Sequence, residues 1–182
     1  MSINLVILAA GKGTRMKSDS AKVLHKVAGA PLLIHAMKAG TSLEPQNIVI
    51  VAGHGADAVS AAALAYDESA QIVLQTEQKG TGHAVLCTKN ALQGATGDLL
   101  VLYGDTPFIS PETLDTMRSA RARFDVVVLG FEAADPARYG RLVMNGNTLE
   151  RIVEFKDASD EERDIRFCNS GVILCSTEHM FE

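Results

Sequence analysis

Two glycines and two cations follow directly after an apolar stretch near the start of the chain. The segment reads LVILAAGKGTRM from Leu5 to Met16, with Gly11 and Gly13 one residue apart and Arg15 close behind. Glycine lets backbone N–H groups approach a ligand closely, and lysine or arginine supplies positive charge, so the pattern predicts binding of a phosphate. The lysine between the glycines excludes a Walker loop, and Met16 replaces the third glycine of a dinucleotide-binding loop. An ordinary strand-to-helix turn stays open as an alternative.

Two later loops carry polar groups that would suit a nucleotide. The segment QTEQKGTGHA contains Gln75 and Gln78, whose amides both donate and accept hydrogen bonds, as reading the edge of a base requires. The segment YGDTP places Asp105 directly after another apolar run. Mg²⁺ prefers one or two carboxylates together with phosphate oxygens, so Asp105 is a candidate metal ligand. Taken alone, Asp105 is better explained as a turn or capping residue, and the glutamines as surface amides.

Histidine offers no sign of acid–base or metal chemistry. His83 is interpreted as a helix-start or packing residue rather than a base, and the other four histidines share no metal-ligand spacing. The charged stretch KDASDEERD is interpreted as a solvated face rather than a metal site, and Ser159 and Glu162 within it have the spacing of a capping box.

Apolar runs of strand length alternate with helical patterns over most of the chain. The predicted strands are Asn4–Ala9, Ile48–Ala52, Gln71–Gln75, Leu99–Tyr103, Asp125–Phe131 and Phe167–Cys175. The predicted helices are Pro31–Leu43, Ala56–Tyr66, Gly82–Leu92 and Pro111–Phe124. Strands that are apolar on both faces and separated by helices indicate an α/β fold with a mainly parallel sheet, whose ligands bind beyond the carboxyl ends of the strands. A β-hairpin is predicted around Asn145-Gly146.

Composition narrows the class of protein. The 182 residues suffice for one domain with a sizeable core, and 47% apolar and 21% charged residues are ordinary globular values. A net charge of −5 argues against a duplex nucleic-acid binder. Three cysteines without a C-x-x-C pair indicate free thiols, and the first apolar run is too short for a signal peptide or a membrane span. We therefore expect a cytoplasmic protein that binds neither nucleic acid nor membrane.

Seven segments together resemble a known enzyme family. In order they are LAAGKGTRM, AKVLHKVAG, QTEQKGTGHA, YGDTP, YGRLV, IVEFKDA and CNSGV. The set is similar to the uridylyltransferase half of the bifunctional N-acetylglucosamine-1-phosphate uridyltransferase/glucosamine-1-phosphate acetyltransferase family, over essentially all 182 residues. The first segment alone would indicate only a sugar nucleotidyltransferase, and the third and fourth narrow the resemblance to this family.

The resemblance implies a fold and a reaction. The fold would be the nucleotide-diphospho-sugar transferase fold, a Rossmann-like, mainly parallel mixed sheet flanked by helices, with a β-hairpin insertion in the second half. It would form a single domain over 1–182, with a nucleotide-binding half at 1–110 and a sugar-binding half at 111–182. The reaction would join UTP and N-acetylglucosamine 1-phosphate into UDP-N-acetylglucosamine and pyrophosphate with Mg²⁺, for peptidoglycan and lipopolysaccharide synthesis.

The same resemblance assigns site residues. The implied catalytic residues are Arg15, Lys22 and Asp105, with Asp105 also binding Mg²⁺. The implied nucleotide contacts are Leu8, Ala9, Ala10, Gly11, Lys22, Gln75, Gln78, Gly80, Thr81, Tyr103, Gly104 and Asp105. Gly140, Glu154 and Asn169 would hold the N-acetylglucosamine. The oxygen of the sugar phosphate is already an anion, so the site needs cations rather than a general base.

Two parts of the family pattern lie beyond Glu182. One is a segment that supplies an asparagine as second Mg²⁺ ligand, and the other is the acetyltransferase β-helix, through which family members trimerise. We therefore expect this chain to be monomeric, to bind the nucleotide sugar and to be weakly active. Two alternatives are a transferase for another sugar 1-phosphate or nucleotide, and a non-catalytic nucleotide-sugar-binding fragment.

Overall fold

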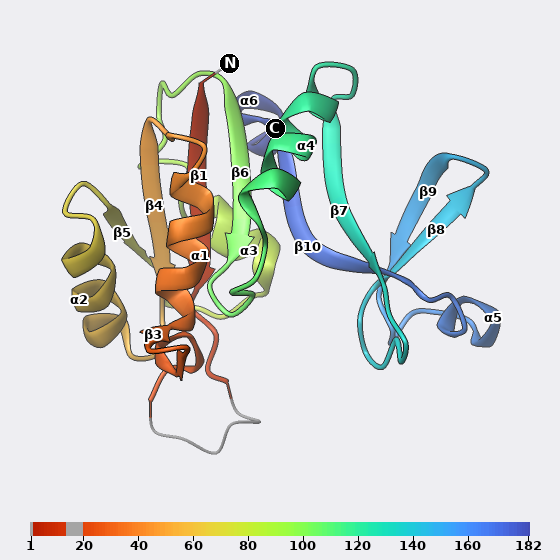
Figure 1. Ribbon diagram of the computed structural model, residues 1–182, viewed down its shortest axis with the longest axis horizontal. Helices are drawn as coiled ribbons and strands as arrows, with labels where there is room; N and C mark the ends of the chain where they lie inside the picture. Colours follow the sequence, from red (N-terminus) through yellow and green to blue (C-terminus); the bar gives the residue numbers. More distant parts are fainter. Residues whose placement is uncertain (1, 14–19) are drawn as a thin grey trace. The chain divides into compact units, whose positions relative to one another are not determined.

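The computed structural model describes residues 2–13 and 20–182 of the chain (Figure 1). The chain forms two compact units, one made of Met1–Val127 with Ile173–Glu182 and the other of Val128–Val172. It passes from the first unit to the second within strand β7 (Val126–Glu132) and returns within strand β10 (Phe167–Ser176). The proposed functional halves 1–110 and 111–182 stay a prediction.

The first unit is built on a mixed sheet in the order β5-β4-β1-β6-β10. Its parallel strands are β1 (Ile3–Ala9), β4 (Asn47–Ala52), β5 (Gln71–Leu74) and β6 (Asp98–Tyr103). Strand β10 joins antiparallel to β6, pairing Ile173 with Val101 and Ser176 with Asp98. Every residue of β1 is buried, as expected for a central strand covered on both faces. The predicted mainly parallel α/β sheet is therefore confirmed.

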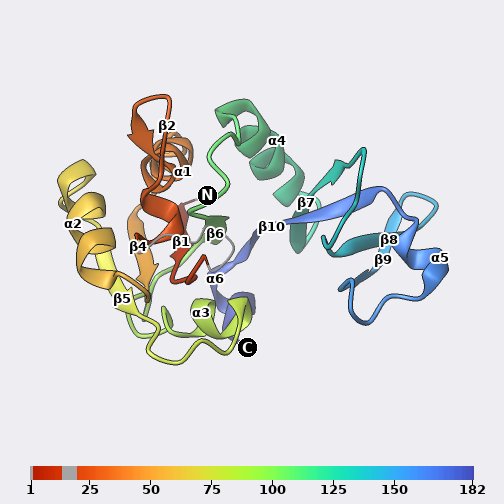
Figure 2. The same ribbon diagram turned by 90° about the horizontal axis from the view of Figure 1, so that it is seen from below.

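Helices cover both faces of this sheet (Figure 2). On one face lie α1 (Leu32–Thr41), α2 (Ala56–Tyr66) and α4 (Pro111–Arg121), and on the other lie α3 (Thr81–Leu86) and α6 (Thr177–Met180). Gly40 of α1 permits close packing, because a Cβ there would lie 2.6 Å from Leu5 Cδ2. On the opposite face, Val6 and Leu8 of β1 belong to one apolar cluster with Val85.

The helix predicted at Gly82–Leu92 is wrong in its extent, because α3 ends at Leu86. After Leu86 the backbone forms turns whose hydrogen bonds span three residues instead of four. The N–H of Thr88 donates to Val85 O at 2.9 Å, and that of Lys89 donates to Leu86 O at 3.1 Å. The hydroxyl of Thr88 donates to the same Val85 oxygen at 2.7 Å. Threonine competes in this way for carbonyls that would continue an α-helix, and the segment continues as turns.

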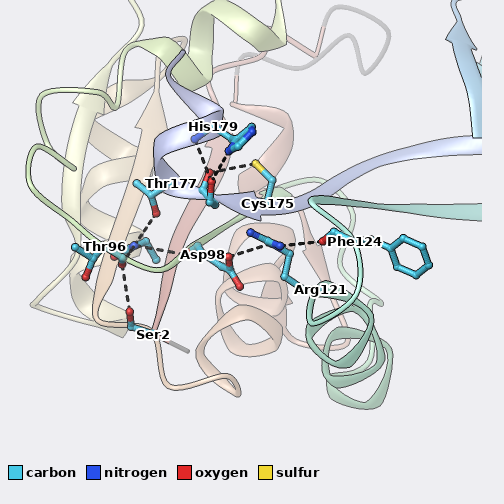
Figure 3. Close-up of polar contacts among 10 residues, drawn as sticks. Ser2, Thr96, Asp98, Arg121, Phe124, Cys175, Thr177 and His179 are labelled. Carbon is cyan, nitrogen blue, oxygen red and sulfur yellow. Dashed lines mark hydrogen bonds and ion pairs between the residues drawn. The ribbon is translucent and has the colours of Figure 1, made fainter.

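The start and end of the described chain are joined by buried polar contacts around Asp98 (Figure 3). Asn4 Nδ2 donates to Thr96 O and to Thr177 Oγ1, both at 3.0 Å. Arg121 Nε lies 3.0 Å from Asp98 Oδ1, and the two side chains are only 15% and 4% exposed. These contacts fasten α4 and α6 to the amino end of the sheet, which is the end opposite the carboxyl ends of β1 and β6.

The second unit contains the predicted hairpin. Its elements are the end of β7, β8 (Arg141–Asn145), β9 (Thr148–Val153), α5 (Asp160–Arg163) and the start of β10. The turn residues are Gly146 and Asn147, closed by the pairing of Asn145 with Thr148, one residue later than predicted. Gly146 has φ +61°, which glycine adopts without strain. The predicted capping box of Ser159 and Glu162 is confirmed at the start of α5.

The cysteines are free thiols, as the sequence indicates. Cys168 and Cys175 are buried and Cys87 is half-buried, and burial raises the pKa of both buried thiols. Within residues 2–13 and 20–182, no helix has the length and apolar character needed to cross a membrane.

Candidate active site

A pocket of about 580 Å³ lies in the first unit, where β1, β5 and β6 give way to loops. This is the edge at which an open parallel sheet binds its ligands. The lining residues are Leu8, Ala10, Gly11, Gly13, Lys22, Val23, Gln75, Gln78, Gly80, Thr81, Ala84, Tyr103 and Asp105.

Most of the residues predicted to contact the nucleotide line this pocket. The exceptions among the described residues are Ala9 and Gly104. Ala9 is buried in β1, and Gly104 donates its N–H to Leu8 O at 2.9 Å, so both act through the backbone that shapes the pocket. Arg15 lies outside the residues that the structure describes. The structure thus brings three distant loops together, while the role of each residue stays a prediction.

Lys22 and Asp105 face each other in the pocket. Lys22 Nζ lies 2.7 Å from Asp105 Oδ2, and the side chains are 40% and 31% exposed. Lys22 begins a short 3-10 helix, η2 (Lys22–Leu24), which is anchored by buried Ala21 and Val23. Gly13 packs against it with φ +57°, so a Cβ at Gly13 would lie 2.7 Å from Lys22 Cβ. Gly13 thus lies directly against the Lys22 side chain, and any larger residue there would displace it.

Asp105 fits the donor chemistry of Mg²⁺. Within the described part of the chain, no group of three His, Cys, Asp or Glu side chains could hold a metal ion. Mg²⁺ at nucleotide sites typically takes one or two carboxylates and completes its octahedron with phosphate oxygens and water. A partly exposed carboxylate that lines the pocket is compatible with that arrangement.

Gln75 and Gln78 connect the loop after β5 to the rest of the pocket. Gln78 Nε2 donates to Ala10 O at 2.9 Å, which joins this loop to the one after β1. Gln75 is only 6% exposed, and its Nε2 donates to Gly80 O at 3.0 Å. The alternative of a surface amide is therefore wrong for Gln75. Gly80 has φ +97°, a conformation that favours glycine, and it caps the start of α3.

His83 is a residue whose contact the sequence reasoning missed. It does lie at the start of α3, as predicted, but its Nδ1 is also 3.1 Å from Gln75 Nε2. Cys87 Sγ lies 4.0 Å from the same nitrogen. The eight-residue separation from Gln75 gave no periodic signal, because the loop between them turns back on itself.

The three residues predicted to hold the sugar lie together in the second unit. The N–H of Asn169 donates to Gly140 O at 2.8 Å, and Asn169 Oδ1 accepts a 2.9 Å hydrogen bond from the N–H of Gly171. A Cβ at Gly140 would lie 3.3 Å from Glu154 Oε1, so the Glu154 carboxylate rests against the bare backbone of Gly140. Strand pairing of β8 with β9 and β10 produces this convergence.

Arg141 organises the backbone around Gly140 and was not singled out from the sequence. It is 1% exposed. Its guanidinium donates to the carbonyls of Pro136, Ala137, Tyr139 and Arg163, which ties the loop before β8 to the end of α5. An arginine inside the otherwise apolar strand RLVM was the available signal.

Comparison with known proteins identifies close relatives. The family model for the MobA-like NTP transferase domain matches residues 5–166. The chain is 66% identical over 181 residues to "Bifunctional protein GlmU" of Ruegeria pomeroyi, covering 100% of this chain and 40% of the relative. It is 63% identical over 182 residues to the protein of the same name from Roseobacter denitrificans, again covering 40% of the relative. The chain thus spans about two fifths of the length of these relatives.

Solved structures share the fold. A UDP-glucose pyrophosphorylase complexed with UDP-glucose superposes with a TM-score of 0.82 at 22% identity, covering 100% of this chain and 78% of the other. HddC from Yersinia pseudotuberculosis, complexed with GMP-PN, superposes with a TM-score of 0.76 at 23% identity, covering 100% and 80%. The predicted nucleotidyltransferase fold is confirmed by these likenesses.

Proposed function

The chain belongs to the MobA-like NTP transferase domain family, and from that premise we propose that it transfers a uridylyl group. It would join UTP and N-acetylglucosamine 1-phosphate into UDP-N-acetylglucosamine and release pyrophosphate. Support comes from the seven sequence segments, from the 66% identity to "Bifunctional protein GlmU" and from the pocket. Its products would enter cell-wall synthesis in the cytoplasm.

The observation that carries the proposal is the gathering of three sequence-distant loops around one pocket. Glycines of the loop after β1, amides of the loop after β5 and the carboxylate after β6 all line it. A nucleoside triphosphate needs these three kinds of group, because its phosphates favour backbone N–H groups and cations while its base presents donors and acceptors. The acidic net charge of the protein does not oppose nucleotide binding, since the cations are local to the site.

The reaction would need positioning more than acid–base chemistry. An oxygen of the sugar phosphate attacks the α-phosphorus of UTP, a bond to the bridging oxygen breaks, and pyrophosphate leaves with that electron pair. The nucleophile is already anionic, so no side chain has to remove a proton. Lys22 and the N–H groups of the loop after β1 would offset the charge on the phosphates and hold the α-phosphate in line.

Mg²⁺ would be held by Asp105 together with phosphate oxygens, and when bound it supplies positive charge at the α- and β-phosphates. In this structure Lys22 pairs with Asp105 Oδ2, so the lysine and the metal would compete for that oxygen. The flexible lysine side chain can then follow the phosphates, because its ammonium is a mobile point charge.

In the second unit, Glu154 and Asn169 would bind the N-acetylglucosamine. The exposed Glu154 carboxylate can accept hydrogen bonds from sugar hydroxyls, and the Asn169 amide can donate. Gly140 leaves space beside the carboxylate that a side chain would reduce. Trimerisation is proposed only for the longer relatives, and a monomer for this chain.

A substrate screen tests the proposal. We would incubate the protein with each of the four ribonucleoside triphosphates, Mg²⁺, and either N-acetylglucosamine 1-phosphate or glucose 1-phosphate, and measure pyrophosphate release and product mass. The expected result is turnover with UTP and N-acetylglucosamine 1-phosphate. Preference for another pair would establish a different sugar nucleotidyltransferase, and binding of UDP-N-acetylglucosamine without any turnover would establish a binding fragment.

A further inference from the structure

The side-chain amide of Gln75 is held in one orientation. Its Nε2 lies 3.0 Å from Gly80 O and 3.1 Å from His83 Nδ1. A backbone carbonyl only accepts hydrogen bonds, so the Gln75 atom facing Gly80 must be the NH₂ group. The orientation of the Gln75 amide thus follows from the Gly80 carbonyl, which cannot donate.

The second contact then bears on the tautomer of His83. Both hydrogens of the Gln75 NH₂ group have a partner if His83 Nδ1 accepts one of them. The thiol of Cys87, with Sγ 4.0 Å from the same nitrogen, is a second possible donor toward it. A neutral imidazole accepts at one nitrogen and donates at the other, so acceptance at Nδ1 corresponds to the tautomer with its hydrogen on Nε2.

With its NH₂ group occupied, Gln75 has its Oε1 left for a ligand. Gln75 lines the pocket, and among the described residues no hydrogen bond to its Oε1 is recorded. We infer that His83 is a positioning residue for base selection, because it holds Gln75 so that an acceptor faces the nucleobase. This inference deepens the proposed function and rests on the nucleotide occupying that pocket.

The chemistry of the acceptor selects among bases. Uracil carries an N–H at position 3, whereas cytosine has an unprotonated nitrogen there that also accepts. An acceptor held in place therefore pairs with uracil and meets cytosine acceptor to acceptor. If the amide could rotate, its NH₂ group would serve cytosine, and discrimination would fall. A buried polar group left unpaired by the wrong substrate is a strong source of selectivity.

Two variants of His83 separate positioning from packing. His83→Leu places an apolar side chain of similar size at the start of α3 and removes the acceptor. His83→Asn places an amide oxygen near the position of Nδ1 and retains it. We would measure dissociation constants for UTP and CTP by calorimetry with Mg²⁺, and thermal midpoints to verify folding. The control is His54→Leu, since His54 lines an adjacent pocket that shares Gln75 and has no recorded bond to that side chain.

The preference for UTP over CTP should fall about tenfold in His83→Leu, as loss of one oriented hydrogen bond implies. It should stay close to the wild-type value in His83→Asn and His54→Leu. An unchanged preference in His83→Leu would overturn the inference, and so would an equal loss in His83→Asn, which would leave only a packing role. If the wild-type protein itself shows no preference for UTP, the proposed function fails instead.

A measurement on the unaltered protein guards against misfolded variants. Nitrogen-15 NMR of the histidine rings, at mildly alkaline pH, reports which ring nitrogen carries the proton. The inference requires an unprotonated Nδ1 at His83 and a Gln75 side-chain NH₂ signal coupled to it. A proton on Nδ1 would contradict it regardless of any binding result.

Discussion

Lys22 Nζ and Asp105 Oδ2 lie 2.7 Å apart, so the carboxylate suited to Mg²⁺ is paired with the lysine suited to phosphate. A divalent metal at Asp105 Oδ2 would compete with the lysine ammonium for that oxygen. In the proposed function, arrival of the nucleotide would relieve this competition, because its phosphates would attract the lysine while contributing oxygens to the metal. Metal binding and nucleotide binding should therefore assist each other.

Lys22→Met should tighten Mn²⁺ binding in the absence of nucleotide. Removing the lysine frees Asp105 and removes a repelling charge, and since half-exposed ion pairs are weak the gain should be about three- to fivefold. Free Mn²⁺ can be measured by electron paramagnetic resonance. UTP should then enhance metal binding less than it does in the wild-type protein. Lys26→Met, at an exposed lysine outside the pocket, is the control, and equal Mn²⁺ affinity in both variants would refute the competition.

Gly13→Ala should weaken UTP binding about tenfold with little change in melting temperature. The φ of +57° disfavours alanine, and the new Cβ would lie 2.7 Å from Lys22 Cβ, so the loop and the lysine must shift. Strain of this kind costs on the order of 1–3 kcal/mol. Calorimetry gives the affinity. Gly82→Ala, where a Cβ meets no atom within 4 Å, is the matched variant and should bind UTP as the wild type does.

Arg141→Leu should lower the local free energy of opening in the second unit by about 3 kcal/mol. The reason is that the backbone carbonyls bound by the guanidinium would be left without a donor. Arg141→Lys should not rescue it, since a single ammonium cannot reproduce the planar fork of donors. Hydrogen exchange at the N–H of Asn169, which bonds to Gly140 O, reports the local free energy of opening. Arg138→Leu, at an exposed arginine of the loop before β8, is the control. Unaltered exchange at Asn169 in Arg141→Leu would contradict the role.

Acid should weaken the start of α5. The hydrogen bond from the N–H of Ser159, followed by that from Arg151, lowers the pKa of Glu162. A carboxyl whose pKa is lower in the folded state stabilises the folded state at pH values above its unfolded-state pKa. That contribution is lost as the pH falls through the folded-state pKa. An NMR titration should find the pKa of Glu162 below the usual range for glutamate and hydrogen exchange in α5 quickening over the same acidic interval. Glu162→Gln should abolish this acid dependence of hydrogen exchange. An unshifted pKa of Glu162 would disprove the coupling between its ionisation and the stability of α5.

Most of the fold could be predicted from local patterns of apolar residues in the sequence. Helix α2 was predicted with its observed bounds, and the apolar runs of β1, β4 and β6 became buried strands, because chain-local periodicity reflects burial on a sheet or helix face. The end of α3 was mispredicted, since a single threonine hydroxyl diverts the helix there. Such competition depends on side-chain geometry that periodicity does not contain.

The candidate site was predictable as a set of loops, but the contacts within it were not. The glycines, Gln75 and Asp105 stand out by type and by their place after strands. The pairing of His83 with Gln75 depends on how the short loop between them turns, and the buried position of Arg141 arises only when segments distant along the chain meet. Histidine in particular was set aside as a packing residue because no catalytic partner was visible in sequence.

Mapping of UTP onto the protein tests the central claim most directly. We would add UTP and Mg²⁺ to nitrogen-15-labelled protein and follow the backbone amide shifts by NMR. The account predicts the largest changes at Gly11, Gly80, Thr81 and Asp105, which line the pocket. N-acetylglucosamine 1-phosphate, added separately, should perturb the amides of Gly140 and Asn169 in the second unit. Shifts confined to other surfaces, with these amides unchanged at saturating UTP, would contradict the assignment of this pocket to the nucleotide.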